Sequence, residues 1–482
     1  MWYIIGMHFL NIFKSLKNKD MLKRVLTVLG ILVAYRLLAQ IPVPMGDAST
    51  FKEAVTNLMA KSDFSNFLNL ISGGGLASFS IILVGLSPYI TGSIVVQLMT
   101  KAIPRLEELS NDGETGRRKI NQWTRILTVP LAIVQSIAYI FILYQSVIAA
   151  NTATEFVPTA GDWILSVVAM TAGSVILMWM GELITEQGIG NGISTLIFAS
   201  IVSQLPSMMA GLSERLSLIE SANLNLFGVE FPVAASVFWG HLAFAVVLIV
   251  IIFCLVKLNE SQRIVTINYA KRVRGNSAYG GIKSILPIKL IAAGVVPVIF
   301  ATAFLSLPAL VGQVITSFDA SNEIGAMLTR VFSAPSAANF ASQYPDGITG
   351  QWFVYPIMYF VLVFAFTYFY TSIIYNTKEM ADNLQKQGGF IEGVRPGIKT
   401  AEYLGKIINR LDLFGALALG LIAMLPFIAD YVFIMVTGAP VGLSISGTSL
   451  LIVVTVALEN LRSVDSRALM ITYDDYSNES ED

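Results

Sequence analysis

Apolar residues recur along the chain in blocks of about twenty, separated by stretches that carry most of the charge. A helix of about 20 residues crosses a hydrocarbon core of about 30 Å, so each block is long enough to span a membrane. The blocks lack the alternation of barrel strands, which favours closed helices. They predict ten membrane-spanning helices, at residues 22–41, 76–100, 123–149, 162–182, 188–210, 236–257, 287–313, 352–375, 407–428 and 441–460.

The basic residues are distributed unequally between the two sets of connecting segments. Of 31 Lys and Arg residues, 26 lie in the N-terminal segment, in the connections after the second, sixth and eighth spans, and in the C-terminal tail. The other side holds only Lys52, Lys61, Arg215 and Arg330. Because cytoplasmic loops carry the excess of basic residues, we expect both termini to be cytoplasmic. The chain start lacks a charged region and a small-residue cleavage site, so no cleavable signal peptide is expected.

The composition excludes several classes of function. Hydrophobic residues make up 55 % and charged residues 13 % of the 482 residues, against about 25 % charged in soluble domains. One cysteine, Cys254, and two histidines exclude a disulfide framework, an iron–sulfur cluster and a cysteine-based zinc site. No phosphate-binding loop motif and no catalytic constellation within the membrane is present. We therefore predict no catalytic residue, metal or cofactor, and an energy source outside this chain.

Ten spans divide into two halves of five, and an odd number of spans per half makes related halves inverted. Interrupted apolar segments at matching positions are the expected sign of such a repeat. Pro88 lies early in the second span and Pro297 in the seventh, which we interpret as a matched pair of helix bends. Residues 64–79 place apolar residues at helical spacing before Gly73, Gly74 and Gly75. This piece fits either a half-helix inserted from the outer side or a short helix on the outer surface.

Two long connections carry basic residues. RIVTINYAKRVRGNSAYGG, after the sixth span, alternates β-branched and aromatic residues and predicts an extended hairpin with a basic tip. NLQKQGGFIEGVRPGIKT, after the eighth span, predicts a glycine-rich loop around Arg395. Basic protruding loops suit an anionic partner such as RNA, an acidic protein surface or lipid headgroups. The alternative is that these charges only fix the orientation in the membrane.

Long strings of the sequence resemble one family, the SecY protein-conducting channels. The resemblance runs from about residue 11 to 465 through all ten spans in order. The strings that carry it are GLSPYITGSIVVQLM (85–99), LEELSNDGETGRRKINQWTRILTV (106–129), GELITEQGIGNGISTLIF (181–198), YAKRVRGNSAYGG, PIKLIAAGVVPVIFA, NLQKQGGFIEGVRPGIKTAEYL and SGTSLLIVV.

The resemblance implies an all-α polytopic membrane protein whose two inverted five-helix halves enclose an hourglass pore. It favours reading residues 64–75 as a plug half-helix that closes the outer funnel. A lateral gate is implied between spans 2–3 and spans 7–8. The implied plug residues are Phe64, Phe67, Leu68, Ile71, Gly73, Gly74 and Gly75. The implied pore ring is Ile94, Ile197, Ile299 and Ile452, extended by Ile90 and Ile201.

The lateral gate candidates are Ser87, Gln97, Gln135 and Ile291, and the motor or ribosome docking candidates are Lys271, Arg272, Arg274 and Arg395. Two positions depart from the family pattern. Asn276 stands where the family often has a basic residue, and Ile291 where it commonly has an asparagine. The closed gate here is therefore expected to depend more on apolar packing.

The implied function is the central subunit of a Sec translocase in the bacterial cytoplasmic (inner) membrane. It passes unfolded secretory chains and releases hydrophobic segments sideways, without hydrolysing nucleotide itself. The implied partners are the SecE and SecG subunits, the SecA motor ATPase, the ribosome, preproteins with signal sequences, membrane lipid, and the accessory proteins SecDF and YidC. Three alternatives stay open: a solute transporter with inverted repeats, an accessory SecY paralogue and a membrane scaffold without a pore.

The expected division of the chain follows from the spans. A cytoplasmic amphipathic segment (1–21) is followed by an N-terminal half (22–210), an external hinge loop (211–235), a C-terminal half (236–460) and a cytoplasmic tail (461–482). The docking loops of the C-terminal half are expected at residues 258–286 and 376–406.

Overall fold

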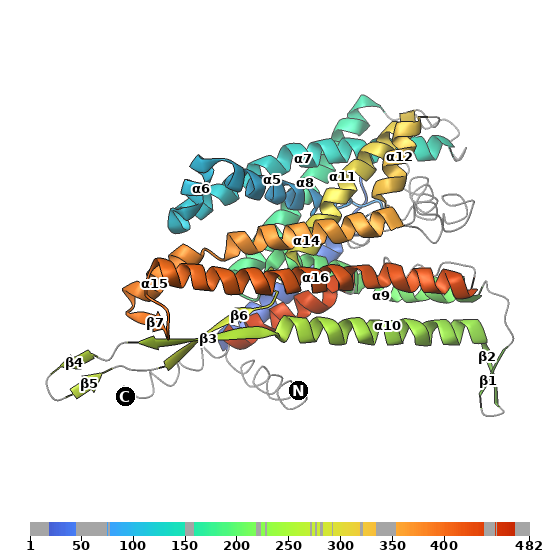
Figure 1. Cartoon of the computed structure of the whole chain (residues 1–482). Helices are drawn as coiled ribbons and strands as arrows, with labels where there is room; N and C mark the ends of the chain where they lie inside the picture. Colours follow the sequence, from blue (N-terminus) through green and yellow to red (C-terminus); the bar gives the residue numbers. More distant parts are fainter. Residues whose placement is uncertain are drawn as a thin grey trace.

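The computed structural model shows a bundle of long helices with small sheets at its two ends (Figure 1). It describes residues 19–44, 75, 78–149, 159–217, 223–226, 229–269, 272–274, 277–279, 283–291, 293–318, 322–333, 353–437, 449 and 451–467. We call the end that carries strands β3, β6 and β7 the sheet end. The opposite end carries the hairpin β1–β2.

The helices of the N-terminal half are α2 (Lys19–Leu38), α5 (Ser87–Ala102), α6 (Pro104–Asn111), α7 (Gly113–Ala149), α8 (Ala160–Glu186) and α9 (Gly192–Ser217). Those of the C-terminal half are α10 (Ala235–Glu260), α11 (Val296–Phe318), α12 (Glu323–Phe332), α14 (Val354–Ile374), α15 (Thr377–Lys386) and α16 (Ile398–Thr437). A further helix over residues 451–467 is called the last helix.

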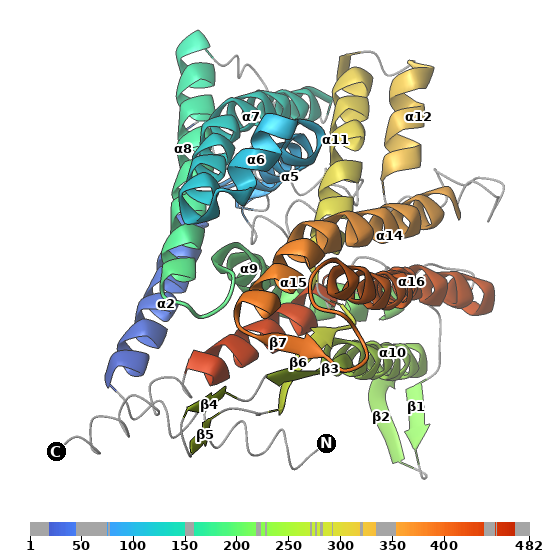
Figure 2. The ribbon, with the colours of Figure 1, turned by 60° about the vertical axis from the view of Figure 1, so that its left-hand side comes forward.

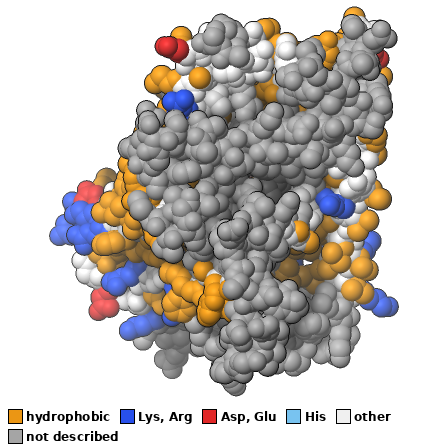
Figure 3. Space-filling view, turned by 90° about the vertical axis from the view of Figure 1, so that its right-hand side faces the viewer, with side chains coloured by type: hydrophobic (Ala, Val, Ile, Leu, Met, Phe, Trp, Pro, Cys, Tyr) orange, Lys and Arg blue, Asp and Glu red, His pale blue; other side chains and the backbone are white. Residues whose placement is uncertain are grey.

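Among the described residues, five helices are long and apolar enough to cross a membrane. They cover Gly113–Gln145, Ala160–Glu186, Val296–Phe318, Val354–Lys386 and Ile398–Ala429. Many of their large apolar side chains are exposed, as in Ile126, Ile164 and Phe414, which suits a lipid surrounding. Seen from the end opposite the sheet, the described flanks are mainly apolar with scattered charges (Figure 3). The protein is therefore a mostly helical membrane protein with several apolar spans.

Two predicted spans begin too early. The second begins as a helix only at Ser87, after turns over residues 78–86, and the seventh only at Val296, after turns that follow strand β6. Apolar residues continue through both non-helical segments because these are buried, as Leu83 and Val295 show. Hydropathy reports burial and not helix formation, so it placed both starts too far upstream.

The interpretation of Pro88 and Pro297 as helix bends is wrong. Each is the second residue of its helix, where a proline is tolerated because its missing N–H has no partner in the helix. The bends expected from an interior proline would lie elsewhere, at Pro130, Pro206, Pro308 and Pro426.

The first residues of α5 and α11 nevertheless follow the same local arrangement. Gly85 and Gly294 each lie three residues before the proline, with φ of +63° and +58°. Only glycine adopts this region without a steric cost. α5 runs toward the sheet end and α11 runs away from it (Figure 1). The same arrangement of glycine and proline thus precedes two helices that run in opposite directions.

Two connections on the sheet end form one sheet. Strand β3 (Gln262–Tyr269) pairs antiparallel with β6 (Lys283–Lys289) on one side and with β7 (Gly389–Ile391) on the other. Beyond them, β4 (Arg272–Arg274) pairs with β5 (Ser277–Tyr279). The predicted hairpin is thus confirmed. The pairing of β7, from the other loop, was not predicted.

Several helices extend beyond the predicted connections. α9 reaches Ser217 inside the predicted hinge loop, which also holds the hairpin of β1 (Asn223–Leu226) and β2 (Val229–Ala234). α10 runs to Glu260, α16 begins at Ile398, and the last helix runs to residue 467. Polar helix ends project beyond an apolar span, so hydropathy cannot locate them. The predicted N-terminal segment 1–21 is described only from Lys19.

Three groups of buried apolar side chains hold the bundle together. The largest joins helices of both halves, including α2, α5, α8, α9, α10, α11, α14, α16 and the last helix. A second joins α7, α8 and α11 near the opposite end, and a third lies between the sheet and α16. α12 packs back on α11 (Figure 2), where a Cβ added to Gly312 would lie 2.8 Å from the Thr329 nitrogen. Such close approach explains why small residues occur between these helices.

Candidate functional site

The six isoleucines predicted as the ring are all buried members of the largest apolar group. α5 supplies Ile90 and Ile94 one turn apart, α9 supplies Ile197 and Ile201, α11 supplies Ile299, and the last helix supplies Ile452. All six belong to one contiguous buried group, and none is more than 8 % exposed. Helices from both halves thus meet at this group, which we call the isoleucine cluster.

The chemistry of the isoleucine cluster is uniform. β-Branched side chains have restricted rotamers and offer no fixed hydrogen-bond pattern. A constriction of this kind excludes water and small ions. The cluster has a polar margin on α5, where Thr91 is buried and its hydroxyl has no partner among the described residues.

The lateral gate candidates do not form one polar patch. Gly92 of α5 lies against Thr124 and Thr128 of α7, with a Cβ position 3.6 Å from the Thr124 carbonyl oxygen. Gln97 lies on the sheet-end side of this contact and Gln135 on the other side. With a rise of 1.5 Å per residue, about 20 Å separates them along the helices. They can therefore contribute to a seam only at two different depths.

Both glutamines keep an unpartnered oxygen among the described residues. Gln97 donates its Nε2 to Ser93 Oγ at 2.8 Å, and its Oε1 has no hydrogen-bond partner. Gln135 is 3 % exposed and its Oε1 is likewise unpaired. A buried amide oxygen without a partner costs about 1–3 kcal/mol, so these atoms are places where an incoming polar group would gain.

Ser87 lies at the start of α5, and Ile291 lies in the turn before α11. Ser87 is buried in the first turn of α5, and Ile291 is buried five residues before α11. A Cβ on Gly415 of α16 would lie 3.7 Å from Ile291 Cγ1. Ile291 therefore packs within its own half and belongs to the same buried group as the isoleucine cluster.

Most plug candidates, Phe64, Phe67, Leu68, Ile71, Gly73 and Gly74, lie outside the described residues. Gly75 is buried, and its carbonyl accepts the amide of Ser80 at 2.8 Å. The two flanks of the segment are joined, since Val43 donates its amide to the Phe79 carbonyl at 2.8 Å. Pro42 and Ser80 form a β-bridge at the same place. The described residues on either side of the segment therefore lie next to each other.

The docking candidates lie at the sheet end. Arg272 and Arg274 are the first and last residues of β4, while Lys271 and Asn276 lie outside the described residues. Arg395 is exposed between β7 and α16, and its carbonyl accepts the Thr400 hydroxyl at 3.0 Å. Because β7 pairs with β3, each predicted docking loop contributes at least one strand to the same three-stranded sheet.

Sequence reasoning missed a polar contact between the two halves. Asn460 of the last helix donates its Nδ2 to Thr195 Oγ1 of α9 at 3.1 Å. The two residues are 265 positions apart. An asparagine near a span end gave no local signal for such a contact. In the described part of the chain, no three His, Cys, Asp or Glu side chains gather as a metal site.

The sequence profile of the SecY family matches residues 80–461. The protein translocase subunit SecY of Corynebacterium glutamicum is 37 % identical over 478 residues, covering 96 % of this chain and 98 % of that one. That of Streptomyces scabiei is 37 % identical over 467 residues with the same coverage. The SecY subunit of Mycobacterium tuberculosis H37Rv is 35 % identical over 466 residues, again covering 96 % and 98 %.

Solved structures agree in fold. One described as a protein-conducting channel superposes with a TM-score of 0.54 at 18 % identity, covering 90 % of this chain and 91 % of that one. Sec61 in the canine ribosome–channel complex gives 0.54 at 16 % identity, with the same coverage. The full-length identity to curated relatives and the matched profile agree with the arrangement of the helices. The chain therefore belongs to the SecY family, the translocase subunits that form a protein-conducting channel.

Proposed function

We propose that the isoleucine cluster is the constriction through which this channel passes unfolded polypeptide. The observation that carries the proposal is that four helices each place isoleucines in the largest buried apolar group: Ile90, Ile94, Ile197, Ile201, Ile299 and Ile452. A gasket of aliphatic side chains seals against ions and holds no preferred sequence. An extended chain can then slide through it whatever its side chains are.

We also propose ten spans in two inverted halves of five. In support, α5 and α11 are the second predicted spans of their halves, and both begin with a positive-φ glycine three residues before a proline. Discontinuous helices at matching positions are typical of inverted repeats, whose transport path lies between the halves. The two helices that share the device both contribute to the isoleucine cluster.

The proposed location is the bacterial cytoplasmic membrane with both termini in the cytoplasm. The relatives at 35–37 % identity are bacterial. The first described helix begins and the last helix ends at the sheet end, where Arg24 and Arg467 both contact the turn between α8 and α9. The connections at that end carry the basic excess expected of the cytoplasmic side.

The lateral gate is proposed at the contact of α5 and α7 with α11, which we call the seam. Here the Phe141 ring of α7 stacks on the Phe318 ring of α11 with centroids 4.3 Å apart. A signal sequence of about 7–15 apolar residues would enter at the seam. Such insertion favours the open state and so shifts the gate equilibrium. Displacement of the plug, residues 64–75, would follow.

The sheet end is the proposed docking surface for the SecA motor ATPase or the translating ribosome. The pairing of β7 with β3 supports this, because it joins the loop that carries Arg395 to the base of the connection that carries Arg272 and Arg274. SecE and SecG are the proposed companion subunits, with SecDF and YidC as accessory partners. Signal-bearing preproteins and membrane lipid complete the set.

A cross-linking experiment tests the constriction. In a Cys254→Ser background, Ile94→Cys is combined with a secretory precursor that carries one cysteine and is stalled in membranes containing the motor ATPase. A disulfide that requires ATP and a signal sequence is expected at residue 94. The matched control is Val95→Cys, since Val95 is the next residue of α5 and is 37 % exposed on the surface of the bundle. Equal cross-linking at both positions, or none at residue 94, would contradict the proposal.

A further inference from the structure

The three-stranded sheet at the sheet end has two different faces. Its inner face is buried against α16. Residues directly opposite each other in an antiparallel pair point to the same face, so the register identifies the members of the other face, which we call the outer face. In facing pairs, they are Gln262 with Lys289, Ile264 with Pro287, Thr266 with Ile285, and Asn268 with Lys283 and Phe390.

The outer face combines exposed apolar side chains with a basic border. Ile285 is 61 % exposed, Ile264 50 % and Phe390 38 %. The strands that carry them lie beyond the end of α10, where the solvated face of an antiparallel sheet is commonly polar. Lys283 and Lys289, at the two ends of β6, are also exposed. An apolar patch with a charged border is typical of an interaction surface.

One polar group on the outer face lacks a partner. Asn268 Oδ1 is buried and accepts no hydrogen bond from the described residues. A buried amide oxygen gains stability when a donor reaches it. A peptide segment laid along the outer face would bring backbone N–H groups to this oxygen. The face therefore offers apolar contact, a hydrogen-bond acceptor and positive charge to the same ligand.

The last helix leads to the base of this sheet. Arg462 donates to the Asn259 carbonyl of α10 at 3.0 Å, and β3 begins three residues after Asn259. Glu459 interacts electrostatically with Lys289, which belongs to the outer face. Residue 468 follows Arg462 after about 9 Å along the helix axis. The chain beyond the last helix therefore starts close to the base of the outer face.

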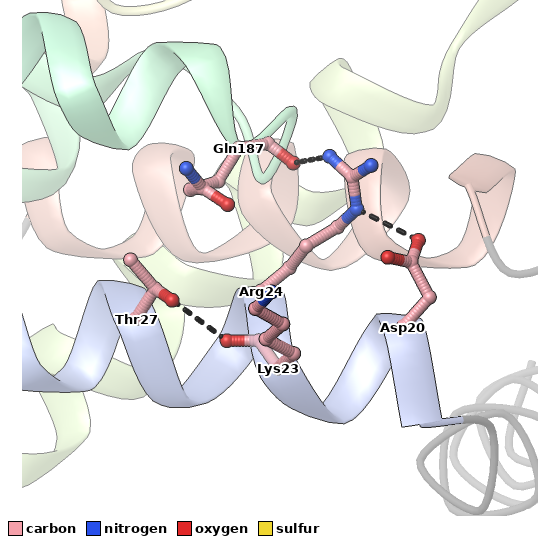
Figure 4. Close-up of polar contacts among 5 residues, drawn as sticks. All are labelled: Asp20, Lys23, Arg24, Thr27 and Gln187. Atoms are coloured by element: carbon pink, nitrogen blue, oxygen red, sulfur yellow. Dashed lines mark hydrogen bonds and ion pairs between the residues drawn. The ribbon is translucent and has the colours of Figure 1, made fainter.

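Another side of the last helix is covered by the N-terminal half. The Cβ position of Gly188 lies 3.4 Å from Arg467 Cζ. The neighbouring Gln187 carbonyl accepts Arg24 at 3.3 Å, and Arg24 also bonds Asp20 at 2.9 Å (Figure 4). Polar contacts thus fill this side, whereas the outer face is exposed.

The chain beyond the last helix has the matching composition. Residues 468–473 are ALMITY, and residues 474–482 hold five acids and no basic residue. Residues 257–289, which contain β3 to β6, hold seven basic residues and one acid. Fifteen residues reach up to about 50 Å when extended, and β3 is about 26 Å long. The segment 468–482, which we call the acidic tail, is therefore long enough to cross the outer face.

The sign of the charge distinguishes the two ends of the chain. α2 begins and the last helix ends at the sheet end, so both terminal segments start there. Residues 1–18 contain Lys14 and Lys17 and no acid, so the basic border repels them. The acidic tail is attracted to the same border.

We propose that the acidic tail binds the outer face and competes there with the partners that dock at the sheet end. This inference rests on the proposed docking surface. A short flexible link gives an effective concentration of about 1 mM, so a contact with a Kd of about 0.1 mM is about nine-tenths formed. A partner that needs the same surface then binds about tenfold more weakly. The tail thereby keeps weakly binding proteins off the resting channel.

Two cysteine pairs test the contact. In a Cys254→Ser background, Tyr473→Cys is combined with Ile285→Cys in the intact translocase, without motor ATPase or ribosome. A mild oxidant is expected to form this disulfide, and several times less of the disulfide between Tyr473→Cys and Ile398→Cys. Ile398 is the matched control, since it is 79 % exposed at the start of α16, the helix that packs on the inner face. Equal cross-linking of the two pairs, or none at residue 285, would overturn the proposal.

Thiol labelling identifies what covers the outer face. Ile285→Cys is labelled with a water-soluble maleimide in membranes that expose the cytoplasmic side. Neutralising the five acids should make labelling about tenfold faster, because the tail then leaves the face. The substitutions are Asp474→Asn, Asp475→Asn, Glu479→Gln, Glu481→Gln and Asp482→Asn, and Ser477→Ala with Ser480→Ala is the control in the same tail. Equal rates in all chains, slow under a cover of lipid or a second chain or fast on a bare face, would overturn the tail as occupant.

The affinity for the motor ATPase separates the competition from the docking proposal. With the five acids neutralised, the motor ATPase should bind the translocase about tenfold more tightly at low salt, and the difference should shrink at high salt. Arg272→Ala with Arg274→Ala should weaken the same binding. Unchanged affinity in both variants would overturn the docking surface and the competition with it. Unchanged affinity with the neutralised tail alone would overturn the competition and leave the docking surface standing.

Discussion

α5 and α11 both begin after a positive-φ glycine that lies three residues before a proline, but the two turns have different surroundings. Before α5, the turn is enclosed by packed helices, including α11: Ile81 donates its amide to the Ile41 carbonyl at 3.0 Å, and its own carbonyl packs on Gly173 of α8. Before α11, the turn continues directly from β6, and Leu290 donates its amide to the Ser261 carbonyl at 2.9 Å.

The two starts thus share one local arrangement, a positive-φ glycine three residues before a proline, but differ in what surrounds it. A protein bound to the sheet end would reach the start of α11 directly through β6, and also through Ser261 and Gly415, which lie against Leu290. It reaches the start of α5 only through the packed bundle. The first start is thus expected to be a fixed support and the second a point of control, and five substitutions test this contrast.

The largest expected effect comes from Gly173→Ala. A Cβ there would lie 2.2 Å from the Ile81 carbonyl oxygen, and backbone cannot move aside as a flexible side chain would. We expect a loss of about 3 kcal/mol, at the upper end for overpacking, measured from unfolding in detergent. Gly405→Ala on α16 is the control, since no atom lies within 4 Å of its Cβ position. Equal stability of the two variants would contradict the enclosed start.

Ile291→Asn restores the residue common in the family at the start of α11. Ile291 is 4 % exposed among apolar side chains, so an amide there is expected to cost about 2 kcal/mol through lost burial and unpaired polar atoms. We expect a change in signal-sequence stringency as well. Ile291→Val, which keeps the apolar contact, should cost about 1 kcal/mol. Unchanged stringency in Ile291→Asn would show that this position does not influence the gate.

Gly294→Ala isolates the backbone conformation of the second start. The nearest atom to its Cβ position is Glu459 Oε2 at 3.8 Å, so no clash arises. The expected cost of about 1–2 kcal/mol is that of a left-handed residue with a side chain. Gly294→Asn should cost less, because asparagine enters this region more readily. If both variants lose equal stability in thermal unfolding, the positive φ is not the cause.

The smallest effects are expected from Pro88→Ala and Pro297→Ala. Each proline is the second residue of its helix. Its replacement therefore raises the conformational entropy of the unfolded chain and does not change the direction of the helix axis. We expect about 0.5 kcal/mol for each, since rigid residues act mainly on the unfolded state. Thermal unfolding of the two variants side by side measures this. A much larger loss at either position would restore the interpretation of that proline as a bend.

The five apolar spans found among the described residues were predictable because apolarity over twenty residues is a local property. The helix starts at residues 87 and 296 were not, since the preceding buried turns are as apolar as the helices. α12 was missed because a ten-residue amphipathic helix beginning at its cap, Asn322, is too short to be seen as a span. β7 was missed because three residues carry no strand pattern, and only β3, far away in sequence, gives them a partner.

The residues of the candidate site were named from the sequence, but their positions relative to one another were not predicted. The six isoleucines came from family motifs, and nothing in their local sequence distinguishes them from other buried isoleucines such as Ile184. The separation of Gln97 from Gln135 became visible only from the contact of Gly92 with α7. The Asn460–Thr195 contact depends on how the halves meet, which no local pattern encodes.

The three-stranded sheet restricts how the lengths of the two connections at the sheet end can change. Ile267 of β3 lies directly opposite Ile391 of β7, both are buried, and Ile391 packs with residues of α16. A shift of one residue in either loop would turn these side chains to the exposed face. An insertion in one loop therefore has to fall outside the paired residues or be matched in the other. A change in side-chain size at position 267 is therefore expected to be tolerated best when position 391 changes with it.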